Sequence, residues 1–149
     1  MKKLFTLILS FIVFSVTAQQ QLPLKPGDPS LQSKWIKNES YQMKWYIMRD
    51  SVTTYEVARI NTKIQVGKDK LVILSNVDVN NAKTTWIDTT TTALPGLQPI
   101  RHYSDNLERA VSLKFGATVS GGYTDKLNNR STVITQGAEG GYFDSNFYS

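Results

Sequence analysis

Apolar and polar side chains alternate along short stretches of the chain, and this constrains the fold more than any other feature. In the segment 41–48, Gln42 and Lys44 separate apolar residues that take the odd positions. These apolar residues are Tyr41, Met43, Trp45 and Ile47. A period of two places successive side chains on opposite faces of a β-strand. The pattern therefore predicts a strand with one buried face.

The same strand-like composition recurs about every ten residues, which is typical of all-β domains. Further strands are expected at 53–59, 62–66, 71–79, 84–90, 98–103, 109–115, 118–124 and 131–135. Turn residues separate them at 67–70, 80–81 and 93–96, and no helical pattern is long enough for a parallel crossover. Residues 41–149 are therefore predicted to form a mainly all-β domain, an antiparallel meander that curls into a half-barrel or barrel.

The amino terminus has the pattern of an export signal. Lys2 and Lys3 precede an apolar run of 13 residues, Leu4–Val16, which is shorter than the roughly 20 residues that a membrane-spanning helix requires. Small side chains end at Ala18, after which the chain becomes polar. Residues 1–18 are therefore interpreted as a signal peptide cleaved after Ala18, with a periplasmic or cell-envelope location for the mature chain.

Residues 19–40 are interpreted as an extended leader that contains a short helix. Pro23 and Pro26 disfavour regular pairing. Asp28 is a favourable N-cap and Pro29 suits the first helical position, so a short helix is predicted over 29–37, with Leu31 and Trp35 one turn apart. This helix is expected to cover one end of the sheet.

Composition excludes several classes of function. The chain has no cysteine, so it cannot be a lipid-modified lipoprotein, and thiol catalysis and Cys-ligated zinc are excluded. The net charge of +5 falls to +3 once the signal peptide is removed. Basic and aromatic residues do interleave at Lys34, Trp35, Lys37, Lys44, Trp45, Tyr46 and Arg49. Tight binding to DNA takes about six to ten phosphate contacts, and this segment has fewer basic residues than that. The segment is therefore interpreted as a solvated face of the sheet, and no nucleic-acid partner is predicted.

No catalytic residue, metal site or cofactor is predicted. The single histidine, His102, is followed by Asp105 and Glu108, but the local pattern is that of a strand and a turn, which does not gather the ligands of a zinc site. No serine occupies the Gly-x-Ser-x-Gly turn of a hydrolase. The glycines at 116, 121 and 122 and at 137–141 fail the phosphate-loop and dinucleotide patterns, and are interpreted as turns.

The remaining chemistry is an apolar face with two interpretations. Its residues are Met43, Trp45, Ile47, Ile73, Trp86, Val111, Leu113 and Phe115. The first interpretation, which we favour at this point, is an ordinary core, because burying each side chain is worth about 1.5 to 3 kcal/mol. The second is a pocket for an acyl chain or a similar apolar ligand, because a curved sheet with few helices cannot fill its own concave side.

The second half of the chain resembles a family of exported bacterial proteins. The motifs that carry the resemblance are Asp88-Thr89, Leu97-Gln98-Pro99-Ile100, Ser112-Leu113-Lys114-Phe115, Val119-Ser120-Gly121 and Tyr142-Phe143-Asp144-Ser145. In order and spacing they are similar to the family named domain of unknown function 3108, over about residues 41–149. The resemblance implies a periplasmic, barrel-like antiparallel sheet and no established activity. Members usually continue past the last motif, so a fragment or a shortened member with an exposed strand edge is expected.

Three functions follow from these observations, in order of preference. The first is a non-catalytic periplasmic binding or carrier module for an apolar or amphiphilic ligand, such as a lipid. The second is a structural or interaction protein of the cell envelope, which binds an envelope protein or a second copy through a strand edge. The third is a small outer-membrane barrel, although most predicted strands are shorter than the 9 to 11 residues that such barrels require.

Overall fold

The computed structural model of the chain describes residues 24–31, 33–80, 86–137 and 141. The predicted signal peptide, 1–18, lies outside these residues. Eight strands form one sheet: β1 (Glu39–Arg49), β2 (Val52–Val66), β3 (Lys70–Val79), β4 (Trp86–Ala93), β5 (Pro99–Asp105), β6 (Arg109–Lys114), β7 (Thr118–Asp125) and β8 (Arg130–Gly137). The predicted all-β fold is therefore confirmed.

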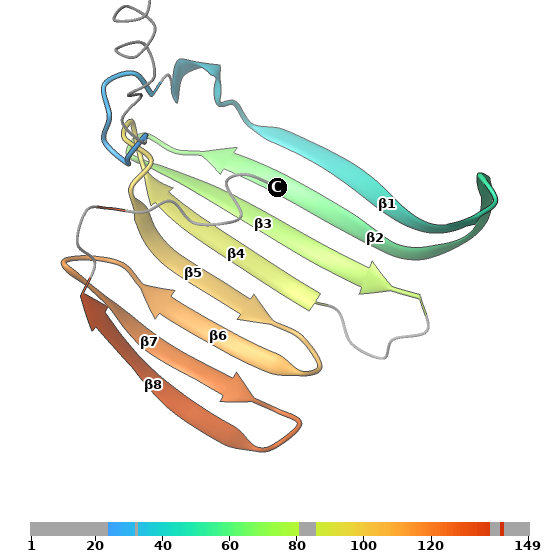
Figure 1. Cartoon of the computed structure of the whole chain (residues 1–149). Coiled ribbons are helices and arrows are strands. Elements are labelled where there is room, and N and C mark those ends of the chain that lie inside the picture. Colours follow the sequence, from blue (N-terminus) through green and yellow to red (C-terminus); the bar gives the residue numbers. More distant parts are fainter. Residues whose placement is uncertain (1–23, 32, 81–85, 138–140, 142–149) are drawn as a thin grey trace, which may run out of the picture.

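The sheet is an antiparallel meander in which each strand pairs with its neighbour in the sequence (Figure 1). The order runs from β1 to β8, and these two strands are the edges of the sheet within the described part of the chain. Because β1 and β8 do not pair with each other, the sheet formed by the described residues is an open half-barrel and not the closed barrel that was the other alternative.

Strand β2 corrects one prediction. The segments 53–59 and 62–66 were expected as separate strands, but they form a single strand of 15 residues. The reason is that Ile60 and Asn61 continue the alternation between the two segments, and β1 pairs with β2 from Glu39 opposite Ile64 to Arg49 opposite Val52. The hairpin predicted at 67–70 is present between β2 and β3.

The predicted helix over 29–37 is also corrected. Among the described residues of this range, the helical element is a short 3-10 helix, η1 (Ser33–Trp35). Asp28 caps a turn instead of a helix, since its Oδ1 accepts hydrogen bonds from the Ser30 amide at 2.8 Å and the Ser30 hydroxyl at 2.6 Å. These two bonds lower the pKa of Asp28. Nothing helical among the described residues has the length and apolar character needed to cross a membrane.

Residues that pair across neighbouring strands have their side chains on the same face of the sheet. We call one of the two faces the inner face, because the buried strand residues lie on it. These are Ala58, Ile60, Thr62, Leu71, Val77, Thr90, Thr92 and Ser104. The opposite, outer face is polar between β1 and β3. There Gln42 donates a hydrogen bond to Asn61 at 2.7 Å, and Asn61 donates one to Asp78 at 3.3 Å.

The odd-numbered face of β1 was expected to be buried, and this prediction is wrong. All eleven side chains of β1 are exposed. Tyr41, Met43 and Trp45 do lie on the inner face, opposite Thr62, Ile60 and Ala58 respectively. They stay exposed because β1 is an edge strand that packs against β2 on one side only.

Glycines in β7 are not the turn residues that their spacing suggested. Gly116 does lie in the connection between β6 and β7, but Gly121 and Gly122 lie inside β7, opposite Leu113 and Ser112 on β6. The backbones approach so closely at Gly121 that a Cβ atom would overlap the carbonyl oxygen of Ser112. A side chain is therefore excluded at Gly121 for reasons of packing.

Candidate ligand-binding site

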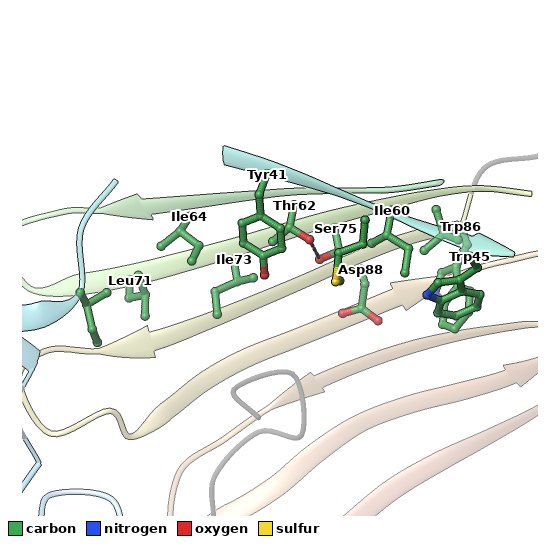
Figure 2. Close-up of a pocket in the computed structure, with 13 residues that line it drawn as sticks. Tyr41, Trp45, Ile60, Thr62, Ile64, Leu71, Ile73, Ser75, Trp86 and Asp88 are labelled. Atoms are coloured by element: carbon green, nitrogen blue, oxygen red, sulfur yellow. Dashed lines mark hydrogen bonds between the residues drawn. The ribbon is translucent and has the colours of Figure 1, made fainter. Parts of the chain in front are cut away.

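A hollow of about 350 Å³ opens on the inner face over β1 to β4 (Figure 2). Its apolar lining consists of Ile36, Tyr41, Met43, Trp45, Ile60, Ile64, Leu71, Ile73, Val77 and Trp86. Its polar lining consists of Thr62, Ser75 and Asp88. The volume lies within the range of pockets that bind small molecules.

The alternation of side chains along each strand brings these lining residues onto the same face of the sheet. Even positions of β2 and odd positions of β3 share the inner face, because Ile60 is opposite Val77 and Ile64 is opposite Ile73. The residue Ile36, which directly follows η1, adds a wall from outside the sheet. The segment before it is held at the same end of the molecule, where the Gly27 amide donates a hydrogen bond of 2.6 Å to the Gly96 carbonyl.

The register sorts the lining into rows that run across the strands. One apolar row contains Met43, Ile60, Val77 and Trp86. The next row is polar and contains Tyr41, Thr62, Ser75, Asp88 and Ser104. The row after it contains Glu39, Ile64 and Ile73 and continues into Thr90 and His102. A polar row therefore crosses the hollow between two apolar regions.

Hydrogen bonds fix the polar row. The hydroxyls of Thr62 and Ser75 lie 3.2 Å apart, and the Trp86 indole donates a hydrogen bond of 3.2 Å to Ser104. Figure 2 shows Asp88 between Trp86, at one end of the hollow, and Leu71, at the other. The row thus presents fixed polar groups near the middle of an otherwise apolar surface.

Asp88 supplies the charge of the hollow. Its side chain is 14% exposed, and Oδ1 lies 3.9 Å from Nδ1 of His102. The same His102 nitrogen lies 3.3 Å from the Thr90 hydroxyl. Neither lysine nor arginine occurs among the lining residues that the structure describes. The nearby cations of β1 and β2, which are Lys44, Arg59 and Lys63, occupy outer-face positions.

Four of the eight residues predicted for a ligand-binding face line the hollow, namely Met43, Trp45, Ile73 and Trp86. Val111 and Leu113 share the inner face, opposite Ser104 and His102, but lie farther along the sheet on β6. Ile47, beyond a register shift in β1, and Phe115, after the end of β6, are not among the lining residues.

Sequence reasoning selected none of the three polar lining residues. Asp88 and Thr90 have the same parity as Trp86, so the alternation that selected Trp86 also places them on its face. Thr62 and Ser75 could be found only with the strand register, since they meet across β2 and β3.

His102 does not gather the acidic residues that follow it. Asp105 lies on the outer face and accepts a hydrogen bond of 2.6 Å from Lys126, whereas Nδ1 of His102 lies 3.9 Å from a carboxylate oxygen of Asp88 on β4. In the part of the chain that the structure describes, no cluster of three or more His, Asp or Glu side chains is placed to hold a metal ion.

Comparison with known proteins yields one match. Residues 40–149 match the model of a family described as "Protein of unknown function (DUF3108)". No curated protein matches the chain, and no solved structure does.

Proposed function

The chain belongs to the DUF3108 family, for which no function is known, and from the geometry of the inner face we propose that it binds a small amphiphilic ligand, with a largely apolar body, in the hollow over β1 to β4. In this proposal the protein is a non-catalytic binding or carrier module, and the predicted signal peptide supports a location in the periplasm or cell envelope.

The observation that carries the proposal is the exposure of apolar side chains on a concave face. Trp45 is 50% exposed and Met43 is 41% exposed, yet both line the hollow. Each square ångström of apolar surface left in water costs about 25 cal/mol, so a ligand that covers these side chains recovers that free energy. Scattered exposed apolar residues are ordinary, whereas a contiguous hollow of them marks a binding surface.

The polar row favours an amphiphile over a purely apolar ligand. Thr62, Ser75 and Asp88 lie inside the hollow, and a hydrocarbon over them would bury their polar atoms without new partners. A ligand with a polar group at this row and apolar atoms over the neighbouring rows matches both parts of the lining. A few polar groups that set orientation within an apolar pocket are typical of small-molecule sites.

The chain offers a matched pair of variants to test the proposal. Met43 and Met48 are both exposed residues of β1, but only Met43 lines the hollow. Decanol is titrated below its solubility limit into the chain lacking residues 1–18, by calorimetry. Binding with one molecule per chain is expected, and Met43→Ser should weaken it about fivefold, since part of one side chain's burial is lost. Met48→Ser should leave it unchanged.

The readout also locates the ligand. Trp45 and Trp86 line the hollow, whereas the third tryptophan, Trp35, is 75% exposed and outside it. Decanol should shift the fluorescence emission of wild type and Trp35→Phe to shorter wavelength, and the shift should shrink in Trp45→Phe. Absence of decanol binding, or equal weakening by both methionine substitutions, would contradict the proposal.

A second candidate function is self-association through a strand edge. Strand β1 has 11 residues and, among the residues that the structure describes, pairs only with β2, so its other edge can accept another strand. Sedimentation of the chain lacking residues 1–18 over a wide concentration range tests this function. A dimer that Gln42→Pro in β1 abolishes would support it, and a monomer at every concentration would eliminate it.

A further inference from the structure

Resting on the proposed binding function, we infer that the hollow selects amphiphiles with a positively charged ammonium head, and that Asp88 is the residue that binds this head. The inference concerns the chemical class of the ligand. It separates alkylammonium compounds from the fatty acids and alcohols that the apolar lining alone would accept equally well.

The position of Asp88 is the first argument. It lies in the polar row, opposite Ser75 on β3 and Ser104 on β5, with Trp86 before it and Thr90 after it on the same face of β4. The side chain is 14% exposed, so its carboxylate acts from a partly desolvated wall. An opposite charge brought to such a site interacts more strongly than at an exposed site, because the local dielectric is lower.

The distribution of charge is the second argument. Asp88 is the single Asp, Glu, Lys, Arg or His among the described lining residues, so the hollow has negative character. Lys44 lies on the outer face and pairs with Glu56 at 3.5 Å. On the inner face, the ionisable side chain paired with Asp88 is that of His102, whose Nδ1 lies 3.9 Å from Oδ1 of Asp88. A carboxylate or phosphate head in the hollow would therefore meet a like charge.

The hydroxyls of the polar row complete the site. An ammonium group carries up to three N–H donors and accepts none. Around Asp88 the row offers acceptor oxygens on Ser75 and Thr62, while the alkyl chain covers the isoleucines or tryptophans beside them. A charge-assisted hydrogen bond to the carboxylate is stronger than one between neutral groups, so the charged head should be preferred to a neutral one.

Three ligands with the same ten-carbon chain test the inference: decylamine, decanol and decanoate, each below its micelle concentration. The amine is protonated at neutral pH, as lysine is. Calorimetry on the chain lacking residues 1–18 should show decylamine binding about 10- to 100-fold more tightly than decanol, and decanoate more weakly than decanol.

Two isosteric substitutions assign the preference to one carboxylate. Asp88→Asn removes the charge from the hollow, and Asp78→Asn removes the same charge from the outer face of β3. Asp88→Asn should abolish the preference for decylamine while decanol still binds, which also shows that the variant folds. Asp78→Asn should keep the preference.

The outcomes separate this inference from the proposed function. Equal binding of the three ligands would overturn the inference and leave the binding function standing. A preference for decylamine that persists in Asp88→Asn would overturn the role of Asp88. Failure of all three ligands to bind would overturn both.

Discussion

The inner face has two halves with opposite relations between polarity and burial. In the half that we call open, over the edge strand β1, large apolar side chains are exposed, and Trp45 is 50% exposed. Over β4 and β5, hydroxyl side chains are buried, and Thr90 and Thr92 are both 0% exposed. The two halves belong to one continuous sheet, so their difference comes from position and not from secondary structure.

The difference shows that the half over β4 and β5 bonds its buried polar groups within itself, with Thr92 Oγ1 as the exception among the described residues, whereas the open half over β1 leaves apolar side chains in water. In the first, polar groups bond one another, as Thr90 does with His102 and Trp86 with Ser104. In the second, no neighbouring strand covers the edge strand β1 among the described residues. Apolar surface that remains in water is where a ligand or partner gains the most free energy.

The largest effect is expected outside both halves, where the backbones of β6 and β7 approach closely at Gly121. Gly121→Ala would drive a methyl group into the Ser112 carbonyl oxygen, so we expect it to destabilise the chain by about 4 kcal/mol or to prevent folding. The neighbouring Gly122→Ala is the control, because a Cβ there would lie 3.8 Å from its nearest atom, the Thr132 carbonyl oxygen. Urea unfolding of both variants makes the measurement, and equal midpoints would contradict the close approach at β7.

Apolar truncations compare a buried position of the inner face, on β3, with an exposed position in the open half. Leu71 on β3 is 1% exposed, so Leu71→Ala should cost about 2 to 3 kcal/mol. Met43 lies on the same inner face but is 41% exposed, so Met43→Ala should cost less than about 1 kcal/mol. Thermal and urea unfolding measure both. A large cost for Met43→Ala would mean that β1 is covered in the free protein, which would remove the basis of the open hollow.

Threonine-to-valine substitutions probe the polar half. Thr92 Oγ1 is buried and has no hydrogen-bond partner in the part of the chain that the structure describes. Thr92→Val removes this hydroxyl at constant shape and should stabilise the protein by about 0.5 to 1 kcal/mol. Thr90→Val, at an equally buried position, loses the bond to His102 and should destabilise it by about 1 kcal/mol. Effects of the same sign would show that the two hydroxyls are not bonded differently.

The strands could be predicted from the sequence because their signal is local. Alternation and turn residues locate strands such as β6, expected at 109–115 and observed at Arg109–Lys114. The helix over 29–37 failed for a physical reason, since Asp28 bonds to Ser30 and closes a turn that ends before a helical hydrogen-bond pattern develops. The local sequence pattern therefore predicted a longer helix than the one that follows Asp28.

The hollow could be predicted only in part, because its shape depends on pairing between distant residues. Trp86 was found by its own apolarity, but the polar row exists only through the register that sets Thr62 opposite Ser75 and Ser75 opposite Asp88. Exposure of β1 likewise follows from its place at an edge, which alternation within the strand does not reveal. The odd or even position of a residue in its strand identifies the face on which its side chain lies. The neighbouring strands decide whether that face is buried.

The smallest effect concerns the outer side of the open half. The pKa of Glu56 is lowered from 4.5, chiefly by its hydrogen bond to Arg59 and further by the charges of Arg59 and Lys44. A carboxyl group with a lowered folded-state pKa stabilises the protein above the unfolded-state pKa, and this contribution is lost as the pH falls through the folded-state pKa. Glu56→Gln should therefore lower stability slightly at pH 7 and have no effect at about pH 2, well below 4.5. Urea unfolding at both values checks this, with Glu39→Gln as the control, since Glu39 makes no ion pair among the described residues. An effect of the same size at both pH values would show that Glu56 stabilises the β1–β2 hairpin by packing and not by its charge.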